Sequence, residues 1–302
     1  MGKTSRDWTQ IYAIYGVDDW QTPLFLLIHA VGFSILSLLF LFYFEPTCYF
    51  LQHFLQHFLP GPASARFAAG FTGSVTALSA VCLFFAAANF FYSAVSLHWD
   101  MSQRIVSSVH DWSSVKHALD LGCGRGILLN AVALQLKKSG SSGRVVGLNP
   151  IRSQNRVLNP TRTLRTAGLE GVQEYVTCRA GDPRTLPFSD SYFDVVVSAV
   201  FLHTVGKEFG PKSAAAAAAE RMRVLGEVVR VLNPGGVGVV WDLVHVPEYV
   251  QRLNEIKMED IRVSERVTAF MVSSHIVSFR KPRQHLVGSD EVRLDWRFNN
   301  LG

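Results

Sequence analysis

The stretch Ala118–Gly126, which reads A-L-D-L-G-C-G-R-G, carries the strongest structural signal in this chain. Apolar residues before it predict a short buried strand, and Asp120 is followed by glycines at the alternate positions Gly122, Gly124 and Gly126. Glycines let the chain turn sharply and lie close to a ligand, because no Cβ stands in the way. Apolar residues after the loop predict a helix whose positive N-terminal end faces the ligand. The stretch therefore predicts a strand, a cofactor loop and a helix.

The glycine spacing separates two families of cofactor loop. A dinucleotide fingerprint requires G-x-G-x-x-G, and Ile127 stands where its third glycine would fall. The pattern D-x-G-x-G-x-G resembles instead the first motif of the class I S-adenosylmethionine-dependent methyltransferases, of the small-molecule, type 11-like branch. The resemblance implies an α/β fold, a Rossmann-like seven-stranded sheet with helices on both faces, and S-adenosyl-L-methionine as cofactor. A glycine-rich loop with no ligand is the alternative.

A second strand is predicted at Arg144–Leu148, and it ends at Asn149. In the resembled family this strand usually ends in an acidic residue whose carboxylate accepts both ribose hydroxyls, so Asn149 departs from the pattern. One amide oxygen still accepts one hydroxyl, without the charge-assisted pairing.

A third predicted strand, Glu174–Cys178, leads into Gly181, Asp182 and Pro183. The run from Gly181 to Asp194 resembles the family's G-D-x-x-x-L-P-F-x-D-x-x-F-D stretch, which implies that Asp182 meets the adenine amino group. The alternative is a strand-end aspartate that bonds its own backbone.

The fourth predicted strand, Asp194–Val200, is an unbroken apolar run typical of a parallel strand covered on both faces. No N-P-P-Y tetrapeptide follows it, which argues against nucleic acid as the methyl acceptor. His203 follows instead, and histidine, with an ordinary pKa near 6.5, is suited to carry a proton. A histidine that simply packs at the strand end is at least as well supported.

The remaining segments agree with the same family. Six alanines open a predicted helix that ends at Asn233–Gly236, and R-V-L-N-P-G-G resembles the family's post-helix turn. A strand at Val237–Asp242, a helix at Pro247–Ile256 and strands at Ile261–Val267 and His275–Phe279 should follow. The resemblance covers about 115–282 and implies cofactor contacts from Asp120, Leu121, Gly122, Cys123, Gly124, Gly126, Asn149, Asp182, Pro183 and Ser198.

The front of the chain has a different composition. The segment 23–44 contains no charged residue, and a helix of its 22 residues spans roughly 33 Å against a hydrocarbon core of about 30 Å. A second charge-free run is most apolar at 75–97, where Asn89 and three neighbouring alanines suit a contact with the first helix. Two transmembrane helices are predicted. A buried helical hairpin and a cleaved signal peptide are the weaker alternatives.

The linker between these runs carries His53 and His57 at helical i, i+4 spacing. Only Cys48 lies near them as a further soft ligand, so an interfacial amphipathic segment is preferred to a metal site, and no metal is predicted. Basic residues are concentrated outside the hairpin, which places both termini in the cytosol. The sequence thus divides into a membrane anchor at 1–100, a methyltransferase domain at 101–282 and a polar tail at 283–302.

The overall composition is consistent with this division. The formal charge of +5 is modest, and the four cysteines show no paired spacing, so no disulfide framework is indicated. We expect an integral two-pass methyltransferase that acts on a small, lipophilic acceptor held near membrane lipids, with the acceptor atom and oligomeric state left open. A membrane scaffold or sensor that retains the cofactor fold, and a membrane-bound nicotinamide reductase, are the alternatives.

Overall fold

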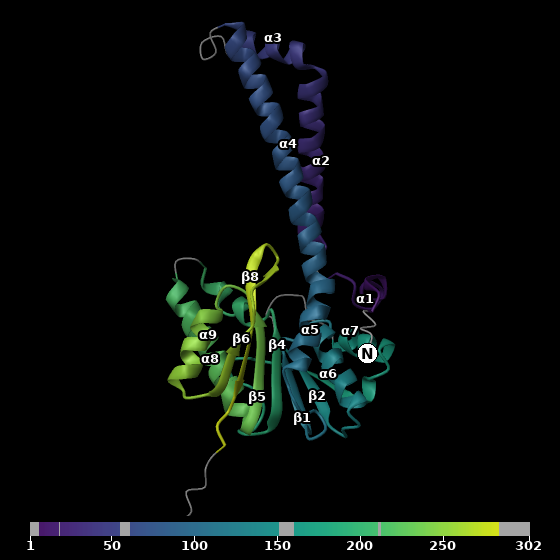
Figure 1. Ribbon diagram of the computed structural model, residues 1–302, viewed down its shortest axis with the longest axis vertical. Helices are drawn as coiled ribbons and strands as arrows, with labels where there is room; N and C mark the ends of the chain where they lie inside the picture. The colour runs from purple at the N-terminus through teal and green to yellow at the C-terminus, as the bar shows by residue number, and fades with distance from the viewer. Residues whose placement is uncertain (1–5, 18, 55–60, 151–159, 211–212, 284–302) are drawn as a thin grey trace, which may run out of the picture.

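A computed structural model describes residues 6–17, 19–54, 61–150, 160–210 and 213–283 of the chain. An α/β domain lies at one end, and a long helical hairpin projects from it (Figure 1).

The sheet of the α/β domain is mixed. Its hydrogen-bonded order is β3-β2-β1-β4-β5-β8-β6, and β7 pairs with β8 beside this path. The first five strands in this order run parallel to one another. Strand β8 runs antiparallel to both of its neighbours, β5 and β6, so β6 has the same direction as the first five. The strands are β1 (His117–Leu121), β2 (Arg144–Pro150), β3 (Val176–Gly181), β4 (Phe193–Ala199), β5 (Leu232–Asp242), β6 (Glu259–Val263), β7 (Val267–Ala269) and β8 (Val272–Arg280).

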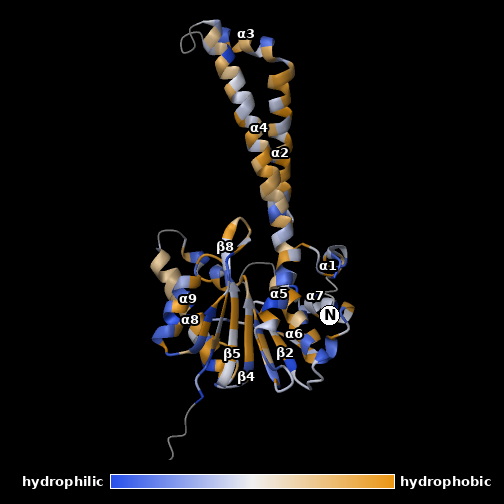
Figure 2. Cartoon of the chain, in the orientation of Figure 1, coloured by the Kyte–Doolittle hydropathy of each residue, from blue (hydrophilic) through white to orange (hydrophobic). Residues whose placement is uncertain are grey.

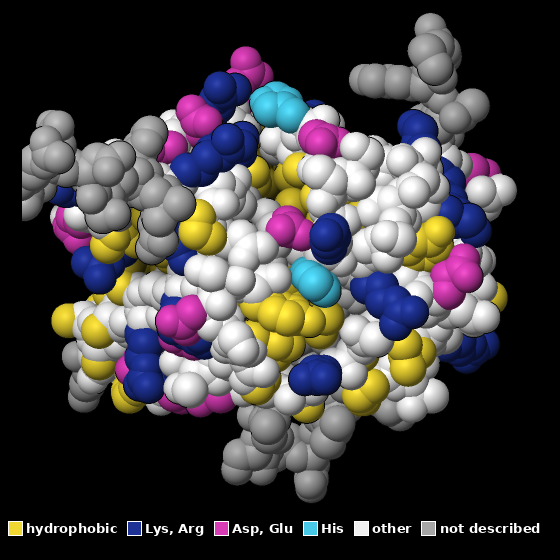
Figure 3. All heavy atoms as spheres, turned by 90° about the horizontal axis from the view of Figure 1, so that it is seen from below, with side chains coloured by type: hydrophobic (Ala, Val, Ile, Leu, Met, Phe, Trp, Pro, Cys, Tyr) yellow, Lys and Arg dark blue, Asp and Glu magenta, His cyan; other side chains and the backbone are white. Residues whose placement is uncertain are grey.

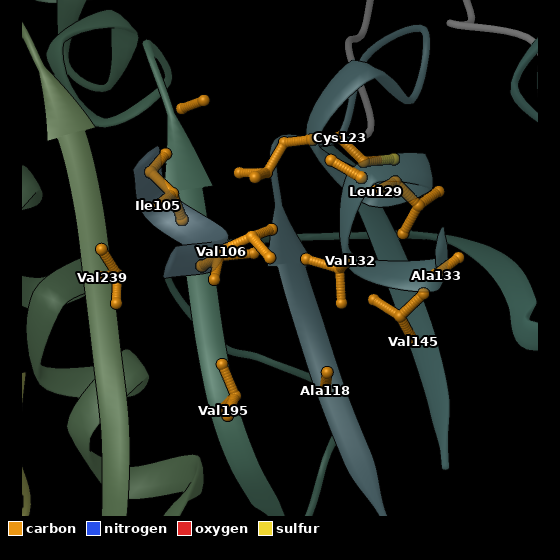
Figure 4. Packing of buried hydrophobic residues seen from close by; sticks show 14 of the residues in the cluster. Ile105, Val106, Ala118, Cys123, Leu129, Val132, Ala133, Val145, Val195 and Val239 are labelled. Atoms are coloured by element: carbon orange, nitrogen blue, oxygen red, sulfur yellow. The ribbon is translucent and has the colours of Figure 1, made fainter. Parts of the chain in front are cut away.

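Helices cover both faces of this sheet. On one face lie α5 (His98–Ser107), α6 (Ile127–Lys138) and α7 (Pro160–Leu169), and on the other α8 (Ala214–Val231) and α9 (Val246–Glu255). Alternate residues of each strand supply the two cores, as Val195 and Val196 do in β4. Figure 4 shows Val195 and Val239 of the strands packed with Val106 of α5. Strand β4 is therefore buried on both faces, as its apolar run predicted, whereas the edge strand β3 exposes Thr177, Arg179 and Ala180.

Several predicted boundaries differ from the structure. The third strand begins at Val176, because Gln173–Tyr175 forms a 3-10 turn. The predicted turn at Asn233–Gly236 lies within β5, where Gly235 N–H donates to Lys281 O at 2.8 Å. The single closing strand predicted at 261–267 is divided into β6 and β7, since the Ser264 hydroxyl, in place of a backbone carbonyl, accepts the Ile276 N–H at 2.9 Å.

The hairpin consists of α2 (Gln21–Phe42), α3 (Phe44–Phe54) and α4 (Pro62–Tyr92). Among the described residues, two helical segments, 21–42 and 62–107, are long and apolar enough to cross a membrane. Figure 2 shows apolar residues along both helices. They meet through small residues: a Cβ at Gly73 would stand 3.1 Å from Phe40 Cβ, and the Ser37 hydroxyl donates to Gly73 O at 3.1 Å.

The second apolar helix is longer than the predicted segment 75–97. It starts at Pro62 and continues through a π-helical turn, Ser93–Leu97, directly into α5. Arg66, which lies inside it, is paired with Glu45 of α3 at 2.9 Å. His53 is exposed at the end of α3, whereas His57 falls outside the described residues.

A short helix, α1 (Trp8–Tyr15), precedes the hairpin and packs back onto the α/β domain. Ile11 and Tyr15 are buried against Val95, Trp99 and Ile127. The segment before the first apolar helix therefore contacts both the foot of the second one and the start of α6.

Candidate functional site

The loop between β1 and α6 has the conformation that its glycines predicted. Gly122, Gly124 and Gly126 have φ values of +81°, +49° and +86°, which L side chains rarely adopt. The Gly122 N–H donates to Leu148 O at 2.8 Å, so the end of β2 holds the loop. Gly126 then stands as the N-cap of α6.

Two of these glycines have different surroundings. A Cβ at Gly122 would stand 2.2 Å from Phe201 Cγ, so the close neighbour there is the segment after β4. Among the residues that the structure describes, a Cβ at Gly124 would meet only the carbonyl oxygen of Gly122, at 3.9 Å. Gly124 therefore leaves room for a ligand against the backbone, and Gly122 makes room for Phe201.

Asp120, at the end of β1, is a buried carboxyl group with only 1% exposure. Its Oδ2 has no hydrogen-bond partner among the residues that the structure describes. Burial, above all, raises its pKa well above the ordinary value of an aspartate. A buried carboxylate needs a compensating partner, so this oxygen is suited to receive a cationic group of a ligand.

Asn149 ends β2 and is also buried. Its Oδ1 accepts the Gly124 N–H at 2.9 Å, so the amide oxygen expected to meet a ribose hydroxyl also fixes the glycine loop. The oxygen has a second lone pair, and its contact with a ribose stays a prediction.

Asp182 follows β3 and is exposed. Its Oδ1 accepts the Arg184 N–H at 2.9 Å, which is the strand-end turn that the sequence offered as the alternative. The β2–β3 register pairs Asn149 with Ala180, so Asp182 lies beside the end of β2. The adenine contact of Asp182, and the buried Pro183 next to it, remain untested predictions.

Two predicted cofactor residues have structural partners in the sheet. The Ser198 hydroxyl donates to Leu121 O at 2.8 Å and thereby ties β4 to the last residue of β1. Cys123 is buried, and a Cβ at Gly147 would stand 2.6 Å from its Sγ. The lack of a side chain at Gly147 therefore makes room for the Cys123 thiol.

His203 lies in a short 3-10 turn, Leu202–Thr204, after β4. Its Nδ1 is 2.6 Å from Asp242 Oδ1, and its backbone N–H donates to Asp242 Oδ2 at 2.8 Å. Tyr249 also donates its hydroxyl to Asp242 Oδ2, at 2.9 Å. Burial and then the charge of Asp242 raise the Tyr249 pKa, so this phenol stays protonated. Asp242 and Tyr249 were not predicted as site residues from the sequence, although an acidic residue at the end of an apolar strand is a usable signal.

All these residues lie at or after the carboxyl ends of neighbouring parallel strands: Asp120 in β1, Asn149 in β2, Asp182 after β3, His203 after β4 and Asp242 in β5. Such ends meet at one edge of the sheet, where open α/β sheets bind ligands.

Comparison with known proteins agrees with this geometry. Residues 119–240 match the family model described as "Methyltransferase domain". These residues form a methyltransferase domain. Its cofactor is S-adenosylmethionine.

Two curated relatives match about half of the chain. A demethylmenaquinone methyltransferase from Lactobacillus johnsonii is 31% identical over 162 residues, which cover 49% of this chain and 58% of that protein. The sterol 4-C-methyltransferase strm-1 from Caenorhabditis elegans is 26% identical over 154 residues, covering 51% and 37% respectively. The chain thus spans less than two thirds of the length of either relative. Among solved structures, the N-methyltransferase NodS from Bradyrhizobium japonicum, in complex with S-adenosyl-L-homocysteine, has 17% identity and a TM-score of 0.43 over 62% of this chain and 87% of that one.

The methyltransferase domain has features that fit this cofactor. S-adenosylmethionine carries an ammonium group, and the unpartnered Oδ2 of Asp120 is a buried acceptor that such a group would satisfy. The open face of Gly124 and the positive end of α6 suit a ligand that lies on the backbone. When bound, the cofactor supplies an activated methyl group, so the protein's task is to orient the acceptor.

The opposite edge of the methyltransferase domain has a different character. A cavity of about 400 Å³ lies there, lined by Asp194, Asn233 and Arg280 among others. Figure 3 views this face, and its basic and acidic side chains are interspersed. Within the described ranges, no group of three or more His, Cys, Asp and Glu side chains is placed to hold a metal ion.

Proposed function

We propose that this chain is a membrane-anchored S-adenosylmethionine-dependent methyltransferase whose acceptor is a small lipophilic molecule that arrives from the bilayer. One observation carries the proposal: the carboxyl edge of the sheet, with the glycine loop, is the edge beside the foot of the apolar hairpin (Figure 1). There the β7–β8 turn meets the end of α4 and the π-helical turn after it. Met271 N–H donates to Asn89 Oδ1 of α4 at 2.9 Å, and Phe270 N–H donates to Ser93 Oγ of the π-helical turn at 2.9 Å. Asn89 was predicted to face the first apolar helix, and in the structure its side chain accepts a hydrogen bond from the α/β domain.

The exposure of the hairpin supports the anchor. Leu41, Phe42 and Leu78 are 70%, 77% and 65% exposed, whereas a core helix of a water-soluble domain buries such side chains. Trp20 and Tyr43 are exposed at the ends of α2, where aromatic rings suit the headgroup level. The alternative of a buried helical hairpin fits these exposures poorly. Both termini would lie in the cytosol, where S-adenosylmethionine is made.

The names of the relatives support a lipophilic acceptor. One relative is named for demethylmenaquinone and the other for a sterol, and both acceptors are lipophilic. An acceptor of this kind partitions into the bilayer, so a site at the foot of two apolar helices would meet it at high local concentration.

The proposal is tested with the full chain in lipid nanodiscs. We expect S-adenosylhomocysteine to bind in calorimetry, and labelled methyl groups to pass from S-adenosylmethionine into the lipid fraction of a membrane extract. Gly124→Val should abolish binding, because its side chain fills the open face of the loop. Gly171→Val is the matched control, since Gly171 has a similar φ of +65° and a Cβ there would have no atom of a described residue within 4 Å.

Undiminished binding by Gly124→Val would refute the placement of the cofactor. Binding without transfer to any fraction would favour the non-catalytic scaffold.

A further inference from the structure

His203 and Asp242 form a pair with a defined orientation. The Asp242 side chain is fully buried, and its two oxygens together meet the His203 ring, the backbone N–H groups of His203 and Leu243, and the Tyr249 hydroxyl. The His203 side chain is 14% exposed. Because Nδ1 faces the carboxylate, Nε2 is the nitrogen left for a ligand.

The backbone holds His203 beside the cofactor loop. Phe201, two residues earlier, lies against Gly122. Val200, which precedes Phe201, has a φ of +50°, a strained value for a β-branched residue. The Val200 N–H donates to Trp241 O at 2.8 Å. Strain of this kind persists only where the surroundings enforce it, and it is concentrated at functional sites. Two adjacent residues of β5 thus fix this segment: Trp241 binds the backbone of Val200, and Asp242 binds the backbone and the ring of His203.

We propose that His203 is the catalytic base of the methyl transfer, that Asp242 and Tyr249 are its positioning residues, and that the acceptor atom is the oxygen of a lipophilic phenol. This inference rests on the function proposed above and adds the acceptor class. Asp242 accepts the Nδ1–H, which leaves an electron pair on Nε2 facing the acceptor. The charge of Asp242 then stabilises the imidazolium that forms.

The step balances as follows. Nε2 takes the hydroxyl proton of the acceptor while the phenolic oxygen forms its bond to the methyl carbon. The electron pair of the broken sulfur–carbon bond stays on sulfur, so the positive charge passes to the imidazolium, which later releases its proton to water.

The choice of a phenol follows from acidity. An ordinary imidazole has a pKa near 6.5 and an ordinary phenol one near 10, so the two lie within about 4 units of each other. Alkyl alcohols are far weaker acids, and imidazole is a poor base for them. A phenol therefore suits this base best among neutral hydroxyl acceptors.

The first experiment observes the tautomer of His203 by ¹⁵N NMR of the histidine-labelled full chain in nanodiscs. We expect neutral His203 to carry its proton on Nδ1, and Asp242→Asn to shift the proton toward Nε2. His203→Gln assigns the signal. The His245–Glu248 pair, at 3.0 Å, is a matched histidine–carboxylate control that should not change. A neutral His203 protonated on Nε2 in the unmodified chain would overturn the proposal.

The second experiment measures methyl transfer to 4-nonylphenol, with 1-decanol as the comparison. We expect transfer to the phenol oxygen, a loss of about 10²–10⁴-fold for His203→Gln and a similar loss for Asp242→Asn. Tyr249→Phe, which keeps the shape of the site, should lose about tenfold. His245→Gln should retain full activity.

The two proposals fail differently. A chain that binds no S-adenosylhomocysteine refutes the proposed function. Two outcomes with a chain that does bind S-adenosylhomocysteine would refute only the proposed base and its acceptor. In one, the His203→Gln variant methylates the phenol as fast as the unmodified chain; in the other, the unmodified chain does not methylate the phenol.

Discussion

The ring of Phe201 lies directly against the backbone of Gly122, so that a Cβ at residue 122 would stand 2.2 Å from Phe201 Cγ. This contact joins the glycine loop after β1 to the segment after β4, which also carries His203. The cofactor loop and the proposed base are therefore held together by packing as well as by the sheet.

Gly122→Ala should lower the stability of the domain by about 2–4 kcal/mol, since it adds overpacking against Phe201 to the strain of a positive φ. Thermal unfolding measures the change. Gly140→Ala is the control, because Gly140 has a φ of +67° and, within the described part of the chain, no atom lies within 4 Å of its Cβ position. Equal stability of the two variants would show that the Phe201 ring gives way easily.

A partly buried ion pair, in which Arg6 is 30% exposed, fixes α1 to the domain. Arg6 donates two hydrogen bonds of 2.7 Å to Glu170, whose side chain is 1% exposed, and Tyr15 donates a third at 2.9 Å. Arg6→Gln should destabilise the docking of α1 by about 2–4 kcal/mol, because it leaves a buried carboxylate without its cation. Hydrogen exchange of Trp8–Tyr15 measures the effect.

The double variant Arg6→Gln/Glu170→Gln provides the check on this reasoning. Removing both charges should recover most of the lost protection. If the amides of α1 exchange as fast in the double variant as in Arg6→Gln, the charges of Arg6 and Glu170 are not what holds α1 on the domain.

The sequence predicted those features that depend on neighbours along the chain. The loop needed glycines at three positive-φ positions, and the apolar runs of β4 and β5 identified buried strands. The unpredicted features join residues far apart in sequence. Asp242 meets His203 across 39 positions, and Ser264 interrupts a strand only because Ile276 lies opposite.

The same distinction explains the site. Asn149 stood out from the family pattern, but its bond to Gly124 depends on how the end of β2 faces the loop. The unpartnered Asp120 oxygen likewise depends on complete burial, which a local pattern does not reveal.

The β7–β8 turn should loosen when its acceptor in the helix is removed. Asn89→Leu keeps α4 apolar and leaves the Met271 N–H without its partner, at a cost of about 1–2 kcal/mol. We expect faster hydrogen exchange at Phe270 and Met271. Ser34→Ala is the control, because the Ser34 hydroxyl donates to Ala30 O within α2, at 2.8 Å. Unchanged exchange in both variants would contradict the coupling.

The raised pKa of Asp120 predicts a pH dependence of cofactor binding. Burial favours the neutral carboxyl, so folding takes up a proton, and this contribution to the stability of the unliganded domain is lost as pH rises through the raised pKa. A bound ammonium group favours the carboxylate and reverses the effect. Affinity for S-adenosylhomocysteine should therefore rise with pH up to the raised pKa, by about tenfold per pH unit at most.

Calorimetry in two buffers with different ionisation heats counts the protons released on binding. Asp120→Asn should abolish the release that comes from this carboxyl and weaken binding by about 10–100-fold, since it removes one charge-assisted bond. Asp111→Asn is the control: Asp111 is an exposed aspartate whose pKa is lowered by a hydrogen bond from Ser113. If proton release persists in Asp120→Asn, another group releases the proton. The ammonium group of S-adenosylhomocysteine would then bind somewhere other than at the end of β1.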